Sequence, residues 1–262
     1  MSELKKDILY HVMIDYDGTL CFQNKISFKN KRAIKKAQKE GYKFILNTGR
    51  SRGNLPKEAL QIDWDYIICG ANYIEKKGEV IYRDEIPYAS LVQVFRVAKN
   101  VGSSIEFEGE KGTLYCKKEE IKNLDEKKFN LFCDEIKEKI KENPITKVDL
   151  WKGMDNRIDA KLQDFAIIHH NEYVELFKKG ATKGTIALKL MEIENIKQEE
   201  LIGIGDSPND LDLLNVCSYK VAMKLAPKSL KDLCDEVTNR SSTGVGDFVN
   251  KLIKIRKSKR NK

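Results

Sequence analysis

Three short runs of polar and small residues carry the side chains of this sequence that could do chemistry together. They are Asp15-Tyr-Asp-Gly-Thr-Leu20, Asn47-Thr-Gly-Arg50 and Gly205-Asp-Ser-Pro-Asn-Asp210. Asp15 and Asp17 are two residues apart, so an extended backbone would point both carboxylates to one side. Two adjacent carboxylates resist ionising together unless a cation lies between them. Because Asp206 adds a third acid and no soft ligand accompanies the three, these runs predict a Mg²⁺ site rather than a zinc site.

Each of these signals has a simpler interpretation when it is taken alone. Asp17-Gly18 is also a common hairpin turn, and Asp206 ahead of Pro208 is also a common helix N-cap. Lys183, by itself, is an ordinary solvated helix lysine. A functional site is favoured because the three runs occur in order, each after an apolar run of strand length.

The elements that must position these residues are buried strands alternating with helices. Apolar runs of strand length cover residues 8–14, 43–46, 66–69 and 201–204. This alternation predicts an α/β fold with a doubly wound, Rossmann-like parallel-sheet core. The carboxyl ends of parallel strands face one crevice, so we expect the three polar runs to converge there.

The pattern of predicted strands and helices changes at Pro87, after which the strands become shorter. The alternation of strand and helix returns after Gly180. We therefore predict a split catalytic core, residues 1–87 and 179–262, with a smaller α/β cap domain, residues 88–178, inserted between its halves. Phe129, Phe132 and Ile136 recur at helical spacing and predict the buried face of a helix in the inserted domain.

Composition bounds the remaining possibilities. The net charge of +8 is concentrated in residues 251–262, which hold seven Lys or Arg and no acid, so the rest carries only +1. Without interleaved aromatic residues we interpret this tail as a frayed, solvated helix end and expect no nucleic-acid partner. Apolar runs of membrane-spanning or signal-peptide length do not occur, and the six cysteines form no Cys-x-x-Cys pair. These features predict a cytoplasmic protein with reduced thiols and no membrane partner.

Taken in order, the motifs resemble those of the haloacid dehalogenase superfamily. Asp-x-Asp-Gly-Thr-Leu, Thr-Gly-Arg, Lys183-Gly184 and Gly-Asp-x-x-Asn-Asp follow one another along nearly the whole chain. The spacing is most similar to that of the Cof-type hydrolases, whose α/β cap lies between the second and third motifs. The resemblance implies a phosphatase, with the cap selecting the substrate.

The resemblance also implies a role for each motif residue. Asp15 would be the nucleophile that forms an aspartyl-phosphate, and Asp17 would act as general acid and base. Mg²⁺ would be held by Asp15, the main-chain carbonyl of Asp17 and Asp206. The substrate phosphate would be bound by Tyr16 and Gly49 (through their amides), Thr48, Lys183 and Asn209. Lys183 would also count among the catalytic residues, and Asp210 would orient Lys183 or a metal-bound water.

Two positions depart from the family pattern. Asn47 occupies a site where a small residue is commoner, and the order Cys69-Gly-Ala-Asn72 replaces the usual Asn-Gly-Ala. For substrate selection in the cap the polar and aromatic candidates are Tyr115, Trp151, Lys152, Arg157 and His169.

The predicted function is a Mg²⁺-dependent phosphatase acting on a small phosphorylated metabolite, such as a sugar phosphate or a cofactor precursor. Asp17 excludes the ion-pumping ATPases of the superfamily, which have Thr at this position. One alternative is a phosphomutase that uses the same nucleophile. Another is a non-catalytic protein that binds through the basic tail, residues 251–262.

Overall fold

A computed structural model describes residues 3–151, 158 and 161–260 of the chain, which divides into two compact units. The first unit comprises Met1–Gly49, Pro56–Tyr82 and Thr182–Lys262, and the second comprises Arg50–Leu55 and Arg83–Ala181. These boundaries lie within a few residues of those predicted at 87 and 178, except that the short segment 50–55 groups with the second unit. That the second unit is a substrate-selecting cap stays a prediction.

The first unit is built on an eight-stranded sheet in the spatial order β15-β14-β13-β1-β4-β5-β6-β7. In the same order its strands are Glu236–Val237, Tyr219–Ala222, Leu201–Gly205, His11–Ile14, Lys43–Thr48, Tyr66–Cys69, Tyr73–Lys76 and Glu79–Arg83. The six strands from β15 to β5 are parallel, and β6 runs antiparallel to β5. The predicted α/β fold with a doubly wound parallel core is therefore confirmed.

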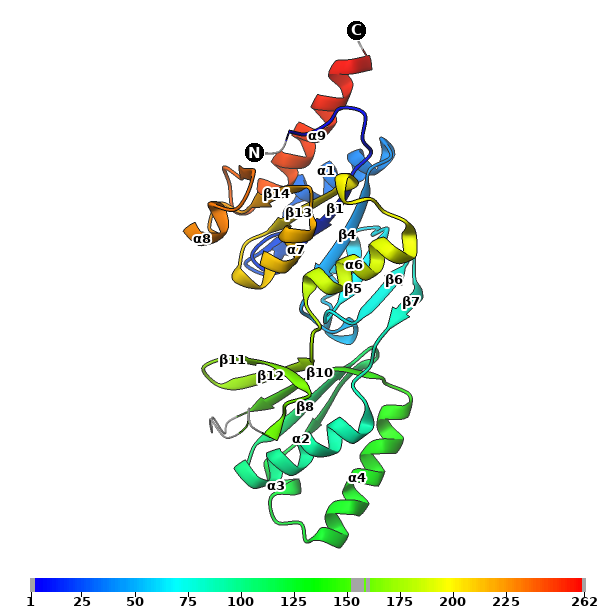
Figure 1. Ribbon diagram of the computed structural model, residues 1–262, viewed down its shortest axis with the longest axis vertical. Coiled ribbons are helices and arrows are strands. Elements are labelled where there is room, and N and C mark those ends of the chain that lie inside the picture. Colours follow the sequence, from blue (N-terminus) through cyan, green and yellow to red (C-terminus); the bar gives the residue numbers. More distant parts are fainter. Residues whose placement is uncertain (1–2, 152–157, 159–160, 261–262) are drawn as a thin grey trace. The chain divides into compact units, whose positions relative to one another are not determined.

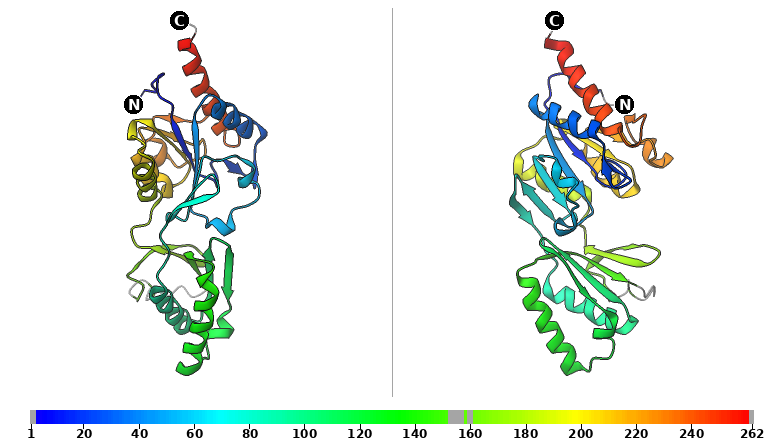
Figure 2. Two further views of the ribbon diagram at one scale, coloured as in Figure 1. Left: turned by 90° about the vertical axis from the view of Figure 1, so that its right-hand side faces the viewer. Right: turned by 180° about the vertical axis from the view of Figure 1, so that it is seen from behind.

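Helices cover both faces of this sheet, as Figure 2 shows. The helices of this unit are α1 (Phe28–Lys39), α6 (Lys183–Glu194), α7 (Leu211–Val216), α8 (Lys228–Lys231) and α9 (Gly244–Arg260). Short 3-10 turns cover Ala59–Gln61 (η2), Gln198–Glu200 (η3) and Pro208–Asp210 (η4), and a small hairpin joins β2 (Cys21–Phe22) to β3 (Lys25–Ile26). Met13 and Ile45 pack with α6 and α7 on one face, and α1 and α9 lie side by side on the other.

The strand order reverses at β1, which lies between β13 and β4. From β1 the chain continues outward to β4 and β5 on one side, and after the second unit it continues from β13 outward to β14 and β15. Such a switch point leaves a crevice at the carboxyl ends of the two central strands. Register pairs Ile14 with both Ile204 and Leu46, so the carboxyl ends of β1, β4 and β13 lie at the same edge of the sheet.

The basic tail corrects an expectation. Residues up to Arg260 form the regular helix α9, whose Leu252 and Ile253 are buried against the first unit, instead of a frayed end. Arg256 donates to the main-chain oxygen of Glu40 at 2.7 Å, and Lys257 pairs with the Glu40 carboxylate at 3.0 Å. The first part of the tail therefore packs on the first unit through Leu252 and Ile253, while Lys251, Lys254 and Lys257 are exposed.

The second unit contains a five-stranded antiparallel sheet in the order β11-β12-β10-β8-β9. Its strands in that order are Phe165–His169, Tyr173–Lys178, Ile145–Trp151, Ser104–Gly109 and Gly112–Cys116. Its helices are α2 (Tyr88–Val101), α3 (Lys118–Ile121) and α4 (Glu126–Lys141), and η1 covers Arg52–Asn54. Phe129 and Ile136 of α4 pack with Phe107 of β8 in one apolar core, as their spacing predicted. Figure 1 labels the helices α2, α3 and α4 and the strands β8, β10, β11 and β12.

In the part of the chain that the structure describes, no helix combines the length and the apolar character needed to cross a membrane. All six cysteines lie in that part, and each is a free thiol.

Candidate active site

The carboxylates of Asp15, Asp206 and Asp210 come together in front of β1 and β13. One oxygen of each lies within 4.8 Å of the others, a spacing at which they could hold one metal ion. Asp15 directly follows β1 and Asp206 directly follows β13, so the two central strands of the sheet deliver them to the same point. This is the crevice that the switch in strand order creates.

The backbone turns immediately after Asp15, which makes room for this approach. Leu20 donates its N–H to the main-chain oxygens of Asp15 and Tyr16, and Gly18 donates to Cys21. Gly18 has a φ of +80°, and a Cβ atom there would lie 2.2 Å from a carboxylate oxygen of Asp206. Only glycine meets both demands, so Gly18 allows Asp206 to come close to the Asp15 loop.

Lys183 lies among these acids as a buried counter-ion. Its Nζ donates to Oδ1 of Asp15 and to Oδ1 of Asp210, both at 2.6 Å, and its side chain is only 6% exposed. The two carboxylates raise the pKa of Lys183 despite the opposing effect of burial, so the ammonium stays charged. Lys183 is the first residue of α6, whose N-cap Thr182 accepts a hydrogen bond from Thr185 N. Its predicted position near the acids is therefore seen in the structure, whereas its chemical role stays a prediction.

Asp210 is held from two sides. While Oδ1 accepts from Lys183, Oδ2 accepts main-chain N–H groups from Asp206 at 2.9 Å and Ser207 at 3.1 Å. All of these bonds hold Asp210 in place against Lys183 and the loop that carries Asp206. The geometry therefore suits the positioning role predicted for Asp210 better than it suits direct metal ligation.

The acids of the cluster carry an electrostatic penalty in the absence of a further cation. Burial raises the pKa of Asp15 to about 7, and the nearby acids Asp210 and Asp206 add to this effect, which Lys183 only partly offsets. Burial also raises the pKa of Asp206, against the lowering effect of a 2.8 Å hydrogen bond from Thr19 Oγ1. A divalent cation between the carboxylates would remove this penalty, and hard oxygen ligands suit Mg²⁺. The donor set thus fits the predicted metal.

The remaining predicted residues lie at the ends of the same strands. Thr48 is buried at the end of β4, and Gly49 follows it with no atom within 4 Å of the place where a Cβ would lie. Tyr16 is buried behind the turn, whereas Asp17 is exposed. The carboxylate of Asp17 is not one of the three that gather, because the chain turns between Asp15 and Asp17 and the backbone is not extended there.

Asn209 lies on the exposed side of η4, where its Oδ1 accepts a hydrogen bond from Ser207 Oγ. Two contacts to the cluster were not assigned from the sequence: that of Thr19 with Asp206, and one from Asn47, whose Nδ2 donates to the main-chain oxygen of Lys183 at 3.1 Å. Thr19 lies within the first motif, and this position is the feature of the sequence that could have indicated its contact with Asp206. Asn47 could be noticed only as a departure from the family pattern.

The residues suggested for substrate selection lie in the second unit. Tyr115 on β9 is half exposed, and His169 ends β11. Trp151 ends β10, stacks on Tyr173 at 4.7 Å between ring centroids and donates to Glu106 at 2.9 Å. Lys152 and Arg157 lie outside the residues that the structure describes.

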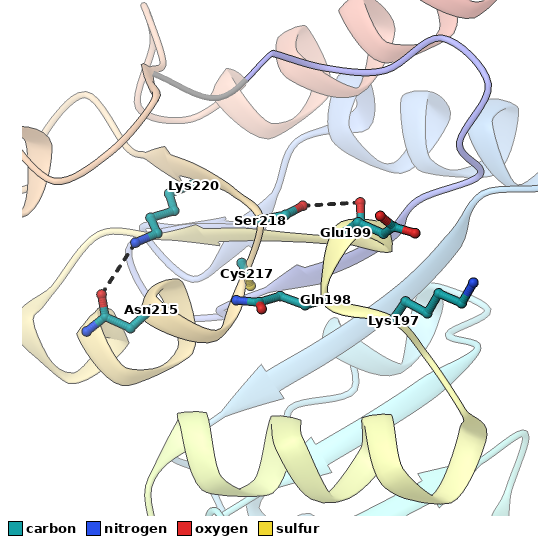
Figure 3. A pocket seen from close by; sticks show the side chains of 7 residues that line it. All are labelled: Lys197, Gln198, Glu199, Asn215, Cys217, Ser218 and Lys220. Carbon is teal, nitrogen blue, oxygen red and sulfur yellow. Dashed lines mark hydrogen bonds between the residues drawn. The ribbon is translucent and has the colours of Figure 1, made fainter.

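A surface hollow elsewhere on the first unit is not this site. It is lined by Lys197, Gln198, Glu199, Asn215, Cys217, Ser218 and Lys220, which Figure 3 shows. Glu199 precedes β13 and Ser218 precedes β14, so the hollow lies at the amino ends of the strands. The clustered acids lie at their carboxyl ends.

Comparisons with known proteins show the family of the chain. The family described as haloacid dehalogenase-like hydrolase matches residues 12–249. The chain is 27% identical over 248 residues to phosphoglycolate phosphatase 1 of Saccharolobus solfataricus, covering 93% of this chain and 95% of the relative. It is 26% identical to 5-amino-6-(5-phospho-D-ribitylamino)uracil phosphatase YwtE of Bacillus subtilis, covering 92% and 97%.

Solved structures show the same fold. The crystal structure of a Thermotoga maritima protein, TM0651, has a TM-score of 0.77 at 21% identity, covering 93% of this chain and 97% of that chain. A sugar phosphatase of haloacid dehalogenase subclass IIB has a TM-score of 0.71 at 20% identity, covering 94% and 99%. At these identities the structural similarity supports the fold alone.

Proposed function

The chain belongs to the haloacid dehalogenase-like hydrolases, and we propose that it is a Mg²⁺-dependent phosphatase that acts on a small phosphorylated metabolite through an aspartyl-phosphate at Asp15. Membership confirms the family predicted from the motifs and makes the protein a hydrolase of the phosphatase type. The metal, the intermediate, the residue roles and the substrate class are the content of the proposal.

One observation carries it: a buried lysine, Lys183, contacts two of three carboxylates that converge at the switch point of a parallel sheet. One oxygen of each of these carboxylates lies within 4.8 Å of the others, so the three acids are close enough to hold a metal ion beside the single lysine. Buried excess negative charge is unfavourable unless a ligand compensates it. The buried charge, together with the close approach of the three carboxylates at the ends of parallel strands, therefore supports a site for a cation and for a reaction in which charge moves.

Asp15 is the proposed nucleophile. Its ionised carboxylate attacks the phosphorus, the bond between phosphorus and the leaving oxygen breaks, and the phosphoryl group becomes bonded to Asp15. Lys183, at 2.6 Å from Asp15 Oδ1, favours the ionised form and stabilises negative charge on the phosphoryl oxygens. Mg²⁺ bound by Asp15, Asp206 and the Asp17 carbonyl would supply further charge neutralisation.

Asp17 is the proposed general acid and base. It protonates the leaving oxygen in the first step and takes a proton from the water that hydrolyses the aspartyl-phosphate in the second. Its side chain is exposed in the turn that follows Asp15. Thr48 and Asn209, together with the amides of Tyr16 and Gly49, bind the phosphoryl oxygens.

The proposed substrate class rests on the named relatives, and the proposed choice among substrates is assigned to the second unit. The named relatives are phosphatases of phosphoglycolate and of a phosphorylated ribitylaminouracil. Both of these substrates are phosphomonoesters of small molecules. We therefore propose that residues 88–178, as the cap, choose among such metabolites, while the core cleaves the phosphoester bond.

The experiment is hydrolysis of p-nitrophenyl phosphate with Mg²⁺, with EDTA and with the Asp15→Asn variant. Turnover that requires the metal and disappears in the variant supports the proposal. Undiminished turnover in Asp15→Asn would exclude Asp15 as nucleophile. Dependence on a bisphosphate activator, with poor transfer to water, would instead indicate the phosphomutase that the sequence left open.

A further inference from the structure

Asn47 is a buried polar residue that the proposed chemistry does not use. It is fully buried near the end of β4, one residue before Thr48. The family resemblance assigns no role to it, because a smaller residue is commoner at this position. Its side chain nevertheless makes a specific contact with the start of α6.

The contact is a hydrogen bond between the Nδ2 group of Asn47 and the main-chain oxygen of Lys183, with a length of 3.1 Å and both groups buried. A carbonyl oxygen can only accept a hydrogen bond, so the amide nitrogen of Asn47 must be the atom that faces it. The chemistry therefore determines the orientation of the side chain. Among the described residues, Oδ1 of Asn47 has no hydrogen-bond partner.

A second contact holds the same stretch of α6 from the side of α7. A Cβ atom on Gly184 would lie 2.5 Å from the main-chain oxygen of Asp212, so the backbones of α6 and α7 touch there. Asn47 and Asp212 thus hold the backbone of residues 183 and 184 between β4 and α7. Asp210, which also bonds the Lys183 ammonium, lies just before α7.

We propose that Asn47 is a positioning residue that fixes the backbone of Lys183, so that its ammonium stays between Asp15 and Asp210. This inference rests on the proposed function, in which Lys183 binds the transferring phosphoryl group. A lysine side chain has four rotatable bonds, and a loose backbone at its base would add to the freedom of the charged end. Misplacement of a charged group by about 1 Å can lower turnover about 100-fold.

The same residue links the two sides of the phosphate site. Thr48, the proposed phosphate ligand from β4, is the next residue along the strand, and successive side chains on a strand point to opposite faces. Asn47 therefore points to the α6 side of the sheet while Thr48 takes the other direction. A shift of β4 relative to α6 would move Thr48 and Lys183 apart, and the hydrogen bond from Asn47 opposes that shift.

A double-mutant cycle between Asn47→Ala and Lys183→Met tests the proposal. We expect Asn47→Ala to lower kcat on p-nitrophenyl phosphate about 10-fold to 30-fold, and to have less than a 2-fold effect when Lys183 is already Met. The same cycle is measured on the dissociation constant of inorganic phosphate in the presence of Mg²⁺. An equal loss in both backgrounds, or no loss in either, would overturn the positioning role.

Asn30→Ala is the matched control. Asn30 is also fully buried and its Nδ2 donates to two main-chain oxygens, those of Leu20 and Ser242, at 3.4 Å and 3.1 Å. We expect this variant to lower the melting temperature with little change in kcat. A loss of kcat in Asn30→Ala as large as that in Asn47→Ala, again with no coupling to Lys183, would mean that destabilisation alone explains the effect.

Two further measurements keep the test decisive. If Asn47→Ala does not fold, Asn47→Asp keeps the side-chain volume but replaces the donor with an acceptor, and the same coupling to Lys183→Met is expected. If the wild type turns over no phosphomonoester, the proposed function fails, yet the cycle on inorganic phosphate binding still measures whether Asn47 acts through Lys183.

Discussion

Among the residues that the structure describes, each unit has a buried lysine with acids around it, Lys183 in the first and Lys147 in the second. The contrast between these two clusters shows what makes one of them a candidate active site. Lys183 in the first unit contacts Asp15 and Asp210, and its side chain is 6% exposed. Lys147 in the second unit is 8% exposed and contacts Glu108, Asp149 and Glu175 at 2.8 to 3.3 Å. The residue types and the burial are nearly the same.

Their backbones differ. Lys147 and Asp149 lie within β10, where the antiparallel register places Glu108 opposite Lys147 and Glu175 opposite Asp149. All of these side chains stand on one face of the sheet and are directed toward the single lysine. In contrast, Asp15 and Asp206 follow the ends of parallel strands, where the chain turns and a common point opens in front of them.

Burial raises the pKa of an aspartate in both clusters, but only one of the clusters has the spacing of a metal site. Burial raises the pKa of Asp149 to about 8, against the lowering effect of Lys147, much as burial raises that of Asp15 to about 7. Within residues 3–151, 158 and 161–260, however, only the first unit's acids gather closely enough to hold a metal ion. A perturbed pKa marks buried charge in both places, and only the geometry separates a site from a structural network.

The largest expected difference concerns the paired aspartates. Asp15→Asn should lower turnover of p-nitrophenyl phosphate about 1,000-fold or more, because it removes the nucleophile. Asp149→Asn should change it less than about 3-fold, since Asp149 takes no part in the reaction in this proposal. Steady-state kinetics with saturating Mg²⁺ measures both, and comparable losses in the two variants would abolish the distinction between the clusters.

Next in size is the effect of removing each lysine. Lys183→Met should lower kcat about 100-fold to 1,000-fold, because it removes a fixed positive charge from the phosphoryl site. Lys147→Met should mainly lower the free energy of unfolding, by about 3–5 kcal/mol, because three acids are left buried without their partner. Kinetics and chemical denaturation of both variants form the test; stability losses without any difference in kcat would contradict it.

The stabilisation of the protein by Mg²⁺ should also distinguish the two clusters, with a smaller effect than the substitutions of the lysines. Mg²⁺ at 100 times its dissociation constant should stabilise the wild type by about 2.7 kcal/mol. Asp206→Asn should lose most of this stabilisation, whereas Glu108→Gln in the second unit should retain it. Thermal melts with and without Mg²⁺ measure the shift, and full retention in Asp206→Asn would remove Asp206 from the metal site.

The smallest effect is the pH dependence of metal binding. Protons compete with Mg²⁺ for Asp15, whose pKa is raised to about 7, so the apparent Mg²⁺ affinity should rise about 10-fold from pH 5.5 to 6.5 and level off above pH 7. Titration calorimetry at pH 5.5, 6.5, 7.5 and 8.5 measures it. A flat profile would mean that Asp15 is already ionised throughout this range.

The raised pKa of Asp15 also makes the stability of the metal-free protein depend on pH, in the opposite direction to the Mg²⁺ affinity. The pKa of Asp15 is about 7 in the folded protein, whereas 3.8 is the ordinary value that applies to the unfolded chain. The folded state therefore binds this proton more tightly than the unfolded state does. The free energy of unfolding should therefore fall as pH rises from about 4 to about 7, and Mg²⁺ should restore it. A metal-free protein whose stability rises over this window would contradict the sign.

Much of the fold could be predicted from the sequence because local apolar patterns and the burial of parallel sheets indicate the same strands and helices. The apolar runs at 43–46, 66–69 and 201–204 correspond to β4, β5 and β13, and the helical spacing of Phe129 and Ile136 corresponds to α4. A parallel sheet is buried on both faces, so its strands are continuous apolar runs that are easy to recognise. The basic tail was misread because its charges outnumber Leu252 and Ile253, the positions that pack.

By itself the sequence determined the motif order, and with it the family, the strand ends that carry Asp15 and Asp206, and the preference for a hard cation. Only the tertiary structure decided that Asp17 is exposed outside this cluster, and that Asn47 donates a hydrogen bond to the main-chain oxygen of Lys183. The physical reason is distance along the chain. Asn47 and Lys183 are separated by 136 residues, and a hydrogen bond across such a separation leaves no periodic trace that a local pattern can reveal.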